Sequence, residues 1–97
     1  MPDKQMILLT LKKAKPSLAK KYGVKDLALF GSYSRNTAIA GKSDVDVMVD
    51  FSQPIGLAFV DLADELEQLL QIKVDLVSRG AIKPKYFALI EPELIYV

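Results

Sequence analysis

Two aspartates, Asp44 and Asp46, are separated by a single residue. Val45, Val47 and Val49 alternate with them, which is the two-residue period of a β-strand with one buried face. Side chains two positions apart point to the same face of a strand, so the two carboxylates are expected to lie side by side. Like charges this close raise each other's pKa, and a divalent cation would remove the repulsion. The pattern therefore predicts an acidic site that binds a metal ion.

A third aspartate, Asp75, lies on another short strand pattern, on the face opposite Val74 and Leu76. If the two strands are neighbours, Asp75 faces the same site, and three carboxylates on adjacent strands can hold two metal ions. The competing interpretation is that acids simply occupy the solvent-exposed face of an alternating strand, which is common. Asp50 and Met48 share the register of the first two aspartates, and Asp50 is assigned no role.

A glycine and a serine, Gly31 and Ser32, follow a short apolar run that ends at Phe30. Glycine lets the backbone approach a ligand closely, and the serine hydroxyl and the turn amides can donate hydrogen bonds to phosphate. Arg35, one turn further on, could reach the same oxygens as a fixed cation. The alternative is a plain strand-to-helix turn that is capped by Ser32.

The chain of 97 residues contains no cysteine and no histidine. This excludes a disulfide framework, thiolate or imidazole metal ligands, a thiol nucleophile and a Ser-His-Asp triad. Chemistry therefore has to use carboxylates, hydroxyls, lysine, arginine, tyrosine and the backbone, and carboxylate ligands favour hard cations such as magnesium or manganese. Hydrophobic residues make up 51% of the chain, and we expect one globular domain over residues 1–97.

The elements that must position these side chains are predicted from periodicity and from breaker residues. Helices are expected over residues 3–13, capped by Asp3, over Pro16–Tyr22 with Pro16 in the first turn, over Leu57–Gln71, and over Pro84–Leu89, with a helical turn at Tyr33–Arg35. Strands are expected over Leu27–Phe30, Asp44–Phe51, Lys73–Ser78 and Glu93–Val97. The apolar stripe of the longest helix is expected to be Phe59, Leu62, Leu66 and Leu69. This order predicts an α+β fold with a small mixed β-sheet and flanking helices.

Charge is distributed unevenly along the chain, although the formal net charge is only +1. Residues 1–25 contain seven lysines and one acid, whereas residues 26–75 contain three basic and nine acidic residues. The basic segment is either a solvated helix face or a surface for phosphate or an acidic partner. No apolar run approaches the roughly 18 residues of a membrane span, and the first residues do not read as a signal peptide. We therefore expect a cytoplasmic protein without membrane contact.

The motifs follow one another within 45 residues, with a spacer of eleven residues between Ser32 and Asp44. The segments LALFGSYSRN, KSDVDVMVDF and IKVDLVSRGAIKP resemble the minimal nucleotidyltransferase domain of the DNA polymerase β superfamily. Together with the ending FALIEPELIYV, the resemblance covers nearly the whole chain. It implies the polymerase β-like nucleotidyltransferase fold and ATP as the substrate. It further implies that Gly31, Ser32 and Arg35 bind the nucleotide and that Asp44, Asp46 and Asp75 are catalytic and hold Mg²⁺, as two ions.

Two departures from the family pattern fall in the loop over residues 36–43. The spacer has eleven residues where ten are usual, so the loop is expected to bulge. Asn36 stands where glycine is usual, but asparagine tolerates a left-handed conformation at small cost. Neither departure touches a predicted metal ligand.

Proteins that resemble this chain are commonly the antitoxin half of a toxin–antitoxin pair. The resemblance implies that the chain transfers AMP from ATP to a tyrosine of a partner HEPN-type ribonuclease toxin, in a hetero-oligomer, and so neutralises the toxin without binding nucleic acid directly. One alternative is a non-catalytic module that masks its partner sterically. Another is transfer of the nucleotide to a small molecule or to an RNA end.

Overall fold

The computed structural model describes residues 3–97, which form an α+β fold. The helices are α1 (Lys4–Tyr22), α2 (Ser32–Arg35), α3 (Ala58–Leu70) and α4 (Pro84–Ile90), and two short 3₁₀ turns are η1 (Arg79–Ala81) and η2 (Glu91–Glu93). The strands are β1 (Val24–Phe30), β2 (Val45–Phe51), β3 (Val74–Ser78) and β4 (Ile95–Tyr96). The expected fold class, a small mixed sheet with flanking helices, is confirmed.

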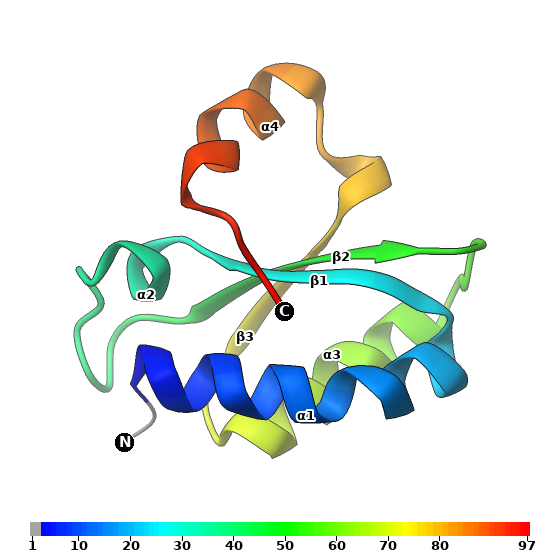
Figure 1. The fold of residues 1–97 in the computed structure, drawn as a ribbon, viewed down its shortest axis with the longest axis horizontal. Helices are drawn as coiled ribbons and strands as arrows, with labels where there is room; N and C mark the ends of the chain where they lie inside the picture. Colours follow the sequence, from blue (N-terminus) through cyan, green and yellow to red (C-terminus); the bar gives the residue numbers. More distant parts are fainter. Residues whose placement is uncertain (1–2) are drawn as a thin grey trace.

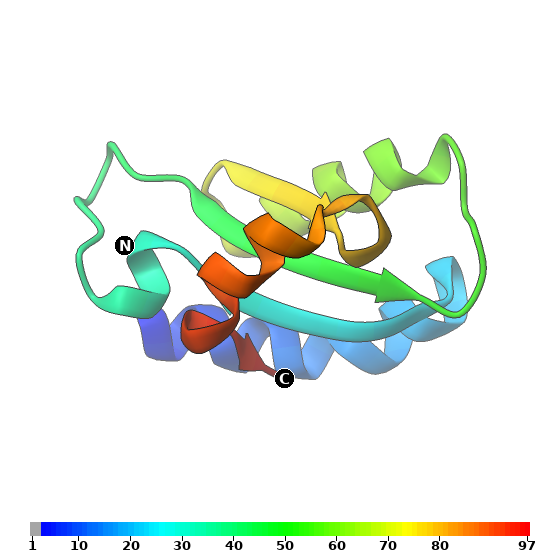
Figure 2. The same ribbon diagram turned by 90° about the horizontal axis from the view of Figure 1, so that it is seen from above.

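The four strands form one sheet in the order β3-β2-β1-β4. β2 and β3 are parallel and are connected through α3, whereas β1 is antiparallel to both of its neighbours, β2 and β4. Figure 1 shows α1 and α3 together on one side of the sheet and α4 on the other. Seen from above, α4 crosses over the strands (Figure 2). The two faces of the sheet are therefore covered unequally, with one long and one medium helix below and one short helix above.

The main core lies between the sheet and the pair α1 and α3, because the alternating strand residues point toward these helices. Its fully buried members include Leu27 and Leu29 of β1, Val45, Val47 and Val49 of β2, Ile7, Leu11 and Leu18 of α1, and Leu62 and Leu66 of α3. In α3 the expected stripe is correct for its two central leucines, but Leu69 is 44% exposed and Leu70 is buried in its place. The helix is thus rotated slightly from the predicted orientation, so that in its last turn Leu70, and not Leu69, faces the core.

The prediction of two amino-terminal helices separated before Pro16 is wrong, because α1 continues through this proline to Tyr22. Proline lacks the N–H that would donate to the carbonyl of Lys12 and usually ends or kinks a helix. Both residues are exposed, so water can solvate the carbonyl, while Leu11 and Leu18 are buried on either side of the proline. Burial of this apolar face outweighs the local cost. The predicted N-cap is confirmed, since Asp3 accepts a hydrogen bond from the Met6 amide at 2.9 Å.

Three further differences concern the burial of Met48 and the bounds of two strands. Met48 was expected on the face of the sheet that carries the aspartates, among polar residues at the surface, yet it is only 1% exposed. β1 begins at Val24 rather than Leu27, and β4 is shorter than the expected Glu93–Val97 strand. The chain after β3 folds back over this face as α4 and η2 (Figure 1), so residues predicted to face water are covered by it. Within residues 3–97, no helix is both long and apolar enough to cross a membrane.

Candidate active site

The candidate site lies where β1 ends and β2 and β3 begin. In the β1–β2 pairing Phe30 is opposite Asp46, and in the parallel β2–β3 pairing Asp46 is opposite Asp75. Burial of Val45 and Val47 in β2 turns Asp46 to the other face of the sheet, and burial of Val74 in β3 does the same for Asp75. The strand order was left open by the sequence; the structure makes β3 a neighbour of β2, which meets the condition stated for Asp75 and juxtaposes the two carboxylates.

Asp46 is the strongly perturbed group of this site. Burial raises its pKa to about 6, and the charge of Asp75, a hydrogen bond with Asp75 and the charge of Asp44 act in the same direction. The positive charge of Arg35 acts against these effects. Four predicted site residues therefore lie close enough to influence one another electrostatically. The ionised form of Asp46 is the disfavoured one, which is the condition that a bound cation would relieve.

Gly31 is adjacent to the Asp46 carboxylate. Its φ of +77° lies in the region that favours glycine, and a Cβ placed on it would lie 2.8 Å from Asp46 Cγ and closer still to a carboxylate oxygen. Sequence reasoning explained this glycine by the close approach of a ligand. The structure adds the approach of Asp46 itself, so that Gly31 is needed for the acidic pair to occupy its position.

The turn after Gly31 is α2, which confirms the expected helical turn and begins with Ser32. Arg35 donates to a carboxylate oxygen of Glu93, with Nη1 and Oε2 2.8 Å apart, and the Gly31 amide donates to the other oxygen of Glu93 at 3.1 Å. Sequence reasoning missed Glu93, which lies 62 residues after Gly31 and carries no local motif. The signal that could have indicated it is a glutamate at the start of the last predicted strand, Glu93–Val97, which is a weak one.

Asp44 is exposed and directly precedes β2. The loop before it contains a compact turn in which the amides of Lys42 and Ser43 both donate to the carbonyl of Ile39. The bulge expected in the loop over residues 36–43 takes the form of this turn. Asn36 ends α2 with a φ of +62°, which confirms the left-handed conformation that asparagine was expected to tolerate.

The donor set fits a hard divalent cation in its chemistry, because it consists of carboxylate oxygens whose mutual repulsion is already expressed in the raised pKa of Asp46. The pair Asp46 and Asp75 is the part of this set that the fold brings together directly. Within residues 3–97, no group of three acidic side chains lies close enough together to coordinate one metal ion. Asp44 contributes its charge from the edge of the pair.

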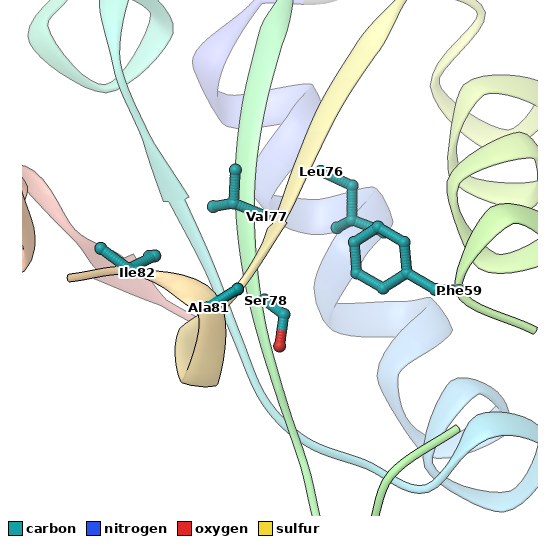
Figure 3. Close-up of a pocket in the computed structure, with 6 residues that line it drawn as sticks. All are labelled: Phe59, Leu76, Val77, Ser78, Ala81 and Ile82. Atoms are coloured by element: carbon teal, nitrogen blue, oxygen red, sulfur yellow. The ribbon is translucent and has the colours of Figure 1, made fainter. Parts of the chain in front are cut away.

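Two cavities lie along β3. The smaller, about 190 Å³, lies between the sheet and α4 and reaches Asp75; it is lined by Phe30, Asp75, Val77, Ile82, Tyr86 and Ile90. The larger, about 430 Å³, lies along β3 toward the end away from Asp75, with Phe59 of α3 facing Leu76 (Figure 3). Its lining is apolar apart from Ser78, so it offers no acid or base. A further cavity, about 220 Å³, is lined by Asp44 together with Lys42, Ser43 and Lys73. The cavities beside Asp75 and Asp44 are therefore the ones that adjoin predicted site carboxylates.

Comparison with known proteins agrees with this geometry. A profile of the family described as nucleotidyltransferase domain matches residues 11–95. A protein of Methanocaldococcus jannaschii that is provisionally named protein adenylyltransferase is 52% identical over 89 residues, which are 90% of each chain. Protein adenylyltransferase MntA of Thermococcus cleftensis is 39% identical over 84 residues, which are 86% of this chain and 84% of that one.

Solved structures give the same fold. One provisionally described as a minimal nucleotidyltransferase has a TM-score of 0.79 at 29% identity and covers 97% of this chain and 95% of that chain. A structure of a tri-AMPylated Shewanella oneidensis HEPN toxin in complex with an MNT antitoxin has a TM-score of 0.66 at 23% identity, over 94% of this chain and 71% of the matched chain. At that identity the second likeness concerns the fold alone.

Proposed function

The chain belongs to the nucleotidyltransferase domain family, and we propose that it is a protein adenylyltransferase that transfers AMP from ATP to a tyrosine of a HEPN-type ribonuclease toxin. The names of its relatives support AMP transfer to a protein. The partner is suggested by the complex of a HEPN toxin and an MNT antitoxin that shares the fold. A bulky anionic group near the ribonuclease site would block RNA, so the chain would act as the antitoxin of a hetero-oligomer.

In this proposal Asp44, Asp46 and Asp75 would hold Mg²⁺, as two ions, while Gly31 lets the backbone approach the triphosphate and Ser32 donates a hydrogen bond to it. Bound magnesium neutralises charge on the reacting phosphate and on the departing pyrophosphate. The carboxylates of this chain supply the opposite charge that keeps such ions in place. The positive charge of Arg35 lies close enough to Asp46 to favour its ionised form, which is the form that coordinates a metal ion.

In the proposed step the tyrosine oxygen attacks the α-phosphorus of ATP, and the bond from that phosphorus to the bridging oxygen breaks. Pyrophosphate leaves with the bonding electrons, and the phenol proton passes to a base. Asp75 is the candidate for this base, because it is exposed and lies in register with Asp46. The products are a tyrosine that carries AMP through a phosphodiester and free pyrophosphate.

The cavity beside Asp75 indicates where the acceptor would enter. Attacking and leaving oxygens lie roughly in line in phosphoryl transfer, so the acceptor approaches opposite the pyrophosphate. Gly31 lies on the β1 side of Asp46 and Asp75 lies on the β3 side. An aromatic acceptor on the β3 side would contact the apolar lining of the 190 Å³ cavity, with the exposed Tyr86 at its rim.

The observation that carries the proposal is the pair of Asp46 and Asp75 beside Gly31. Keeping Asp46 where its charge is disfavoured lowers the stability of the free protein, and strongly perturbed carboxyl groups of this kind cluster at functional sites. A module that only masked its partner would gain nothing from this arrangement. The pair therefore favours the enzyme over the steric mask.

The experiment is to incubate the chain with a co-purified HEPN partner, ATP and Mg²⁺, and to weigh the partner by intact mass spectrometry. We expect a mass gain of one or more AMP units, mapped to a tyrosine, together with loss of ribonuclease activity. Asp46→Asn should abolish the gain. Asp50→Asn, four residues along on the same face of β2, is the matched control and should retain it.

Inhibition of the ribonuclease without any mass gain would instead support steric masking. AMP on an RNA end or on a small molecule, with an unmodified partner, would support the remaining alternative. Equal transfer by Asp46→Asn and the wild-type chain would contradict the proposed role of the carboxylates.

A further inference from the structure

We propose that Glu93 is a positioning residue that fixes the Gly31–Arg35 turn for nucleotide binding, and that Arg35 is its structural partner rather than a direct ligand of phosphate. This inference rests on the proposed function, since it concerns nucleotide binding at the same turn. It adds a residue from the end of the chain to a site that the sequence motifs place within residues 31–75.

The contacts of Glu93 define its role. One carboxylate oxygen accepts from the Gly31 amide at 3.1 Å, and the other accepts from Arg35 Nη1 at 2.8 Å. The backbone carbonyl of Glu93 accepts a further hydrogen bond from the Ser34 hydroxyl. Three positions of one short turn are therefore attached to a single residue in η2. The turn is also held from the other side, because Lys4 of α1 donates to the carbonyl of Ser34 at 3.0 Å.

The Glu93 carboxylate is largely buried, so it depends on these hydrogen bonds. The Glu93 side chain is 18% exposed, whereas that of Arg35 is 52% exposed. A carboxylate removed from water to this extent needs donors, and a charge-assisted pair with an arginine is among the stronger ones available. This carboxylate accepts from the amide of Gly31, the same residue that lies against the Asp46 carboxylate, and Arg35 neutralises its charge there. Glu93 and Arg35 thus form one unit, in which each partner makes the position of the other acceptable.

The consequence concerns what the turn can bind. Two of the groups that sequence reasoning assigned to phosphate, the Gly31 amide and the Arg35 guanidinium, both donate to Glu93. The Gly31 amide is thereby fixed in direction, next to the Asp46 carboxylate that requires a glycine at this position. Of the groups assigned to phosphate, the Ser32 hydroxyl is then left to bind it, and the fixed turn sets its position. We infer that Glu93 contributes to nucleotide affinity by limiting the conformations of this turn before the nucleotide arrives.

Two roles for Arg35 make opposite predictions. If Arg35 is a structural partner, Glu93→Ala and Arg35→Ala both loosen the turn, both weaken ATP binding, and the double variant is no weaker than either single variant. If Arg35 is a phosphate ligand that Glu93 merely restrains, Glu93→Ala frees it. ATP binding by Glu93→Ala would then tighten, while Arg35→Ala alone would weaken it.

The test measures MgATP affinity by isothermal titration on the full chain. We expect about ten-fold weaker binding in Glu93→Ala, similar weakening in Arg35→Ala and in the double variant, and a smaller effect in Glu93→Gln, which keeps an acceptor for the Gly31 amide. Glu91→Ala, two residues away in the same 3₁₀ turn, is the matched control and should bind as the wild type does. Hydrogen exchange at the Gly31 amide should accelerate in Glu93→Ala in parallel with the loss of affinity.

The outcomes separate the two proposals. A wild-type chain that does not bind MgATP would overturn the proposed function and the role of Glu93 with it. A wild-type chain that binds MgATP, with unchanged or tighter binding in both Glu93 variants, would overturn only the positioning role. Because Glu93→Gln preserves the size and shape of the side chain, it keeps the test valid if the alanine variant does not fold.

Discussion

Asp46 lies where its negative charge is disfavoured by burial, by Asp75 and by Asp44. The neutral, nearly isosteric Asp46→Asn is therefore expected to be more stable than the wild type in the absence of metal ions. Because the residue is partly exposed and solvent screens such effects, we expect a gain in unfolding free energy of about 1 kcal/mol at pH 7.5. Urea unfolding in the presence of a chelator measures it.

The sign of the pH dependence follows from the direction of this shift. The pKa of Asp46 is about 6 in the folded protein and has an ordinary value of 3.8, so between these values the folded state holds the proton more tightly. This favourable contribution is complete below about pH 4 and is lost as the pH rises through about 6. The advantage of Asp46→Asn should accordingly vanish near pH 4 and be full above pH 6. Asp50→Asn is the control, and an advantage that does not change with pH would contradict this origin.

Gly31 is subject to two constraints that can be measured separately. Gly31→Ala has to accept a positive φ, which costs about 1–2 kcal/mol, and in addition has to displace the Asp46 carboxylate. Gly56→Ala is the matched control, since Gly56 also has a positive φ but has no atom within 4 Å of an added Cβ. We expect Gly31→Ala to lose more unfolding free energy than Gly56→Ala and to lose transfer activity, which Gly56→Ala keeps. Equal losses in the two variants would show that the contact with Asp46 is unimportant.

At the scale of elements, α1 carries an avoidable cost at Pro16, which lies inside the helix and on its exposed side. Pro16→Ala restores the N–H that donates to the Lys12 carbonyl, and it should raise the unfolding free energy by about 1–3 kcal/mol. Pro84→Ala is the control, because Pro84 stands in the first turn of α4, where no such donor is needed. That variant should be neutral or slightly less stable, as measured by thermal unfolding. No gain from Pro16→Ala would mean that α1 already relieves the proline by bending.

Strand β2 and helix α1 show what local sequence patterns can and cannot predict. Alternating valines fix the strand around Asp46 because register and burial coincide there, and its boundaries are predicted to within one residue. The break at Pro16 was inferred from local chemistry, whereas burial of Leu11 and Leu18 on one continuous face decides the outcome. Tertiary burial of this kind cannot be read from the residues near the proline.

Long-range contacts set the other limit. The turn at Gly31 was predictable from its residues, but its attachment to Glu93 depends on the path of the chain after β3. Met48 is likewise buried, although alternation alone marks its face of β2 as solvent-exposed. The chain after β3 crosses over the strands as α4 (Figure 2), which local patterns do not predict. The strand around Asp46 and the turn at Gly31 thus follow from local patterns, whereas the pairing of Asp46 with Asp75 and the covering of the site follow from topology.

At the scale of the whole molecule, folding and ion binding are linked through the acidic pair. A cation that binds the folded state alone raises the unfolding free energy, by about 2.7 kcal/mol at a concentration one hundred times its dissociation constant. Thermal unfolding at pH 7.5 should therefore shift to higher temperature with Mg²⁺ or Mn²⁺ relative to a chelator. At pH 5, below the pKa of about 6 of Asp46, protons compete for the carboxylate and the shift should shrink.

Asp46→Asn and Asp50→Asn distinguish a specific site from general screening of a negatively charged surface. Between residues 26 and 75 the chain has nine acidic and three basic residues, so any divalent cation reduces repulsion there to some extent. General screening would shift both variants alike and would persist at pH 5. A site built on Asp46 should lose its shift in Asp46→Asn and retain it in Asp50→Asn, because Asp50 lies four residues further along β2, outside the register pair with Asp75.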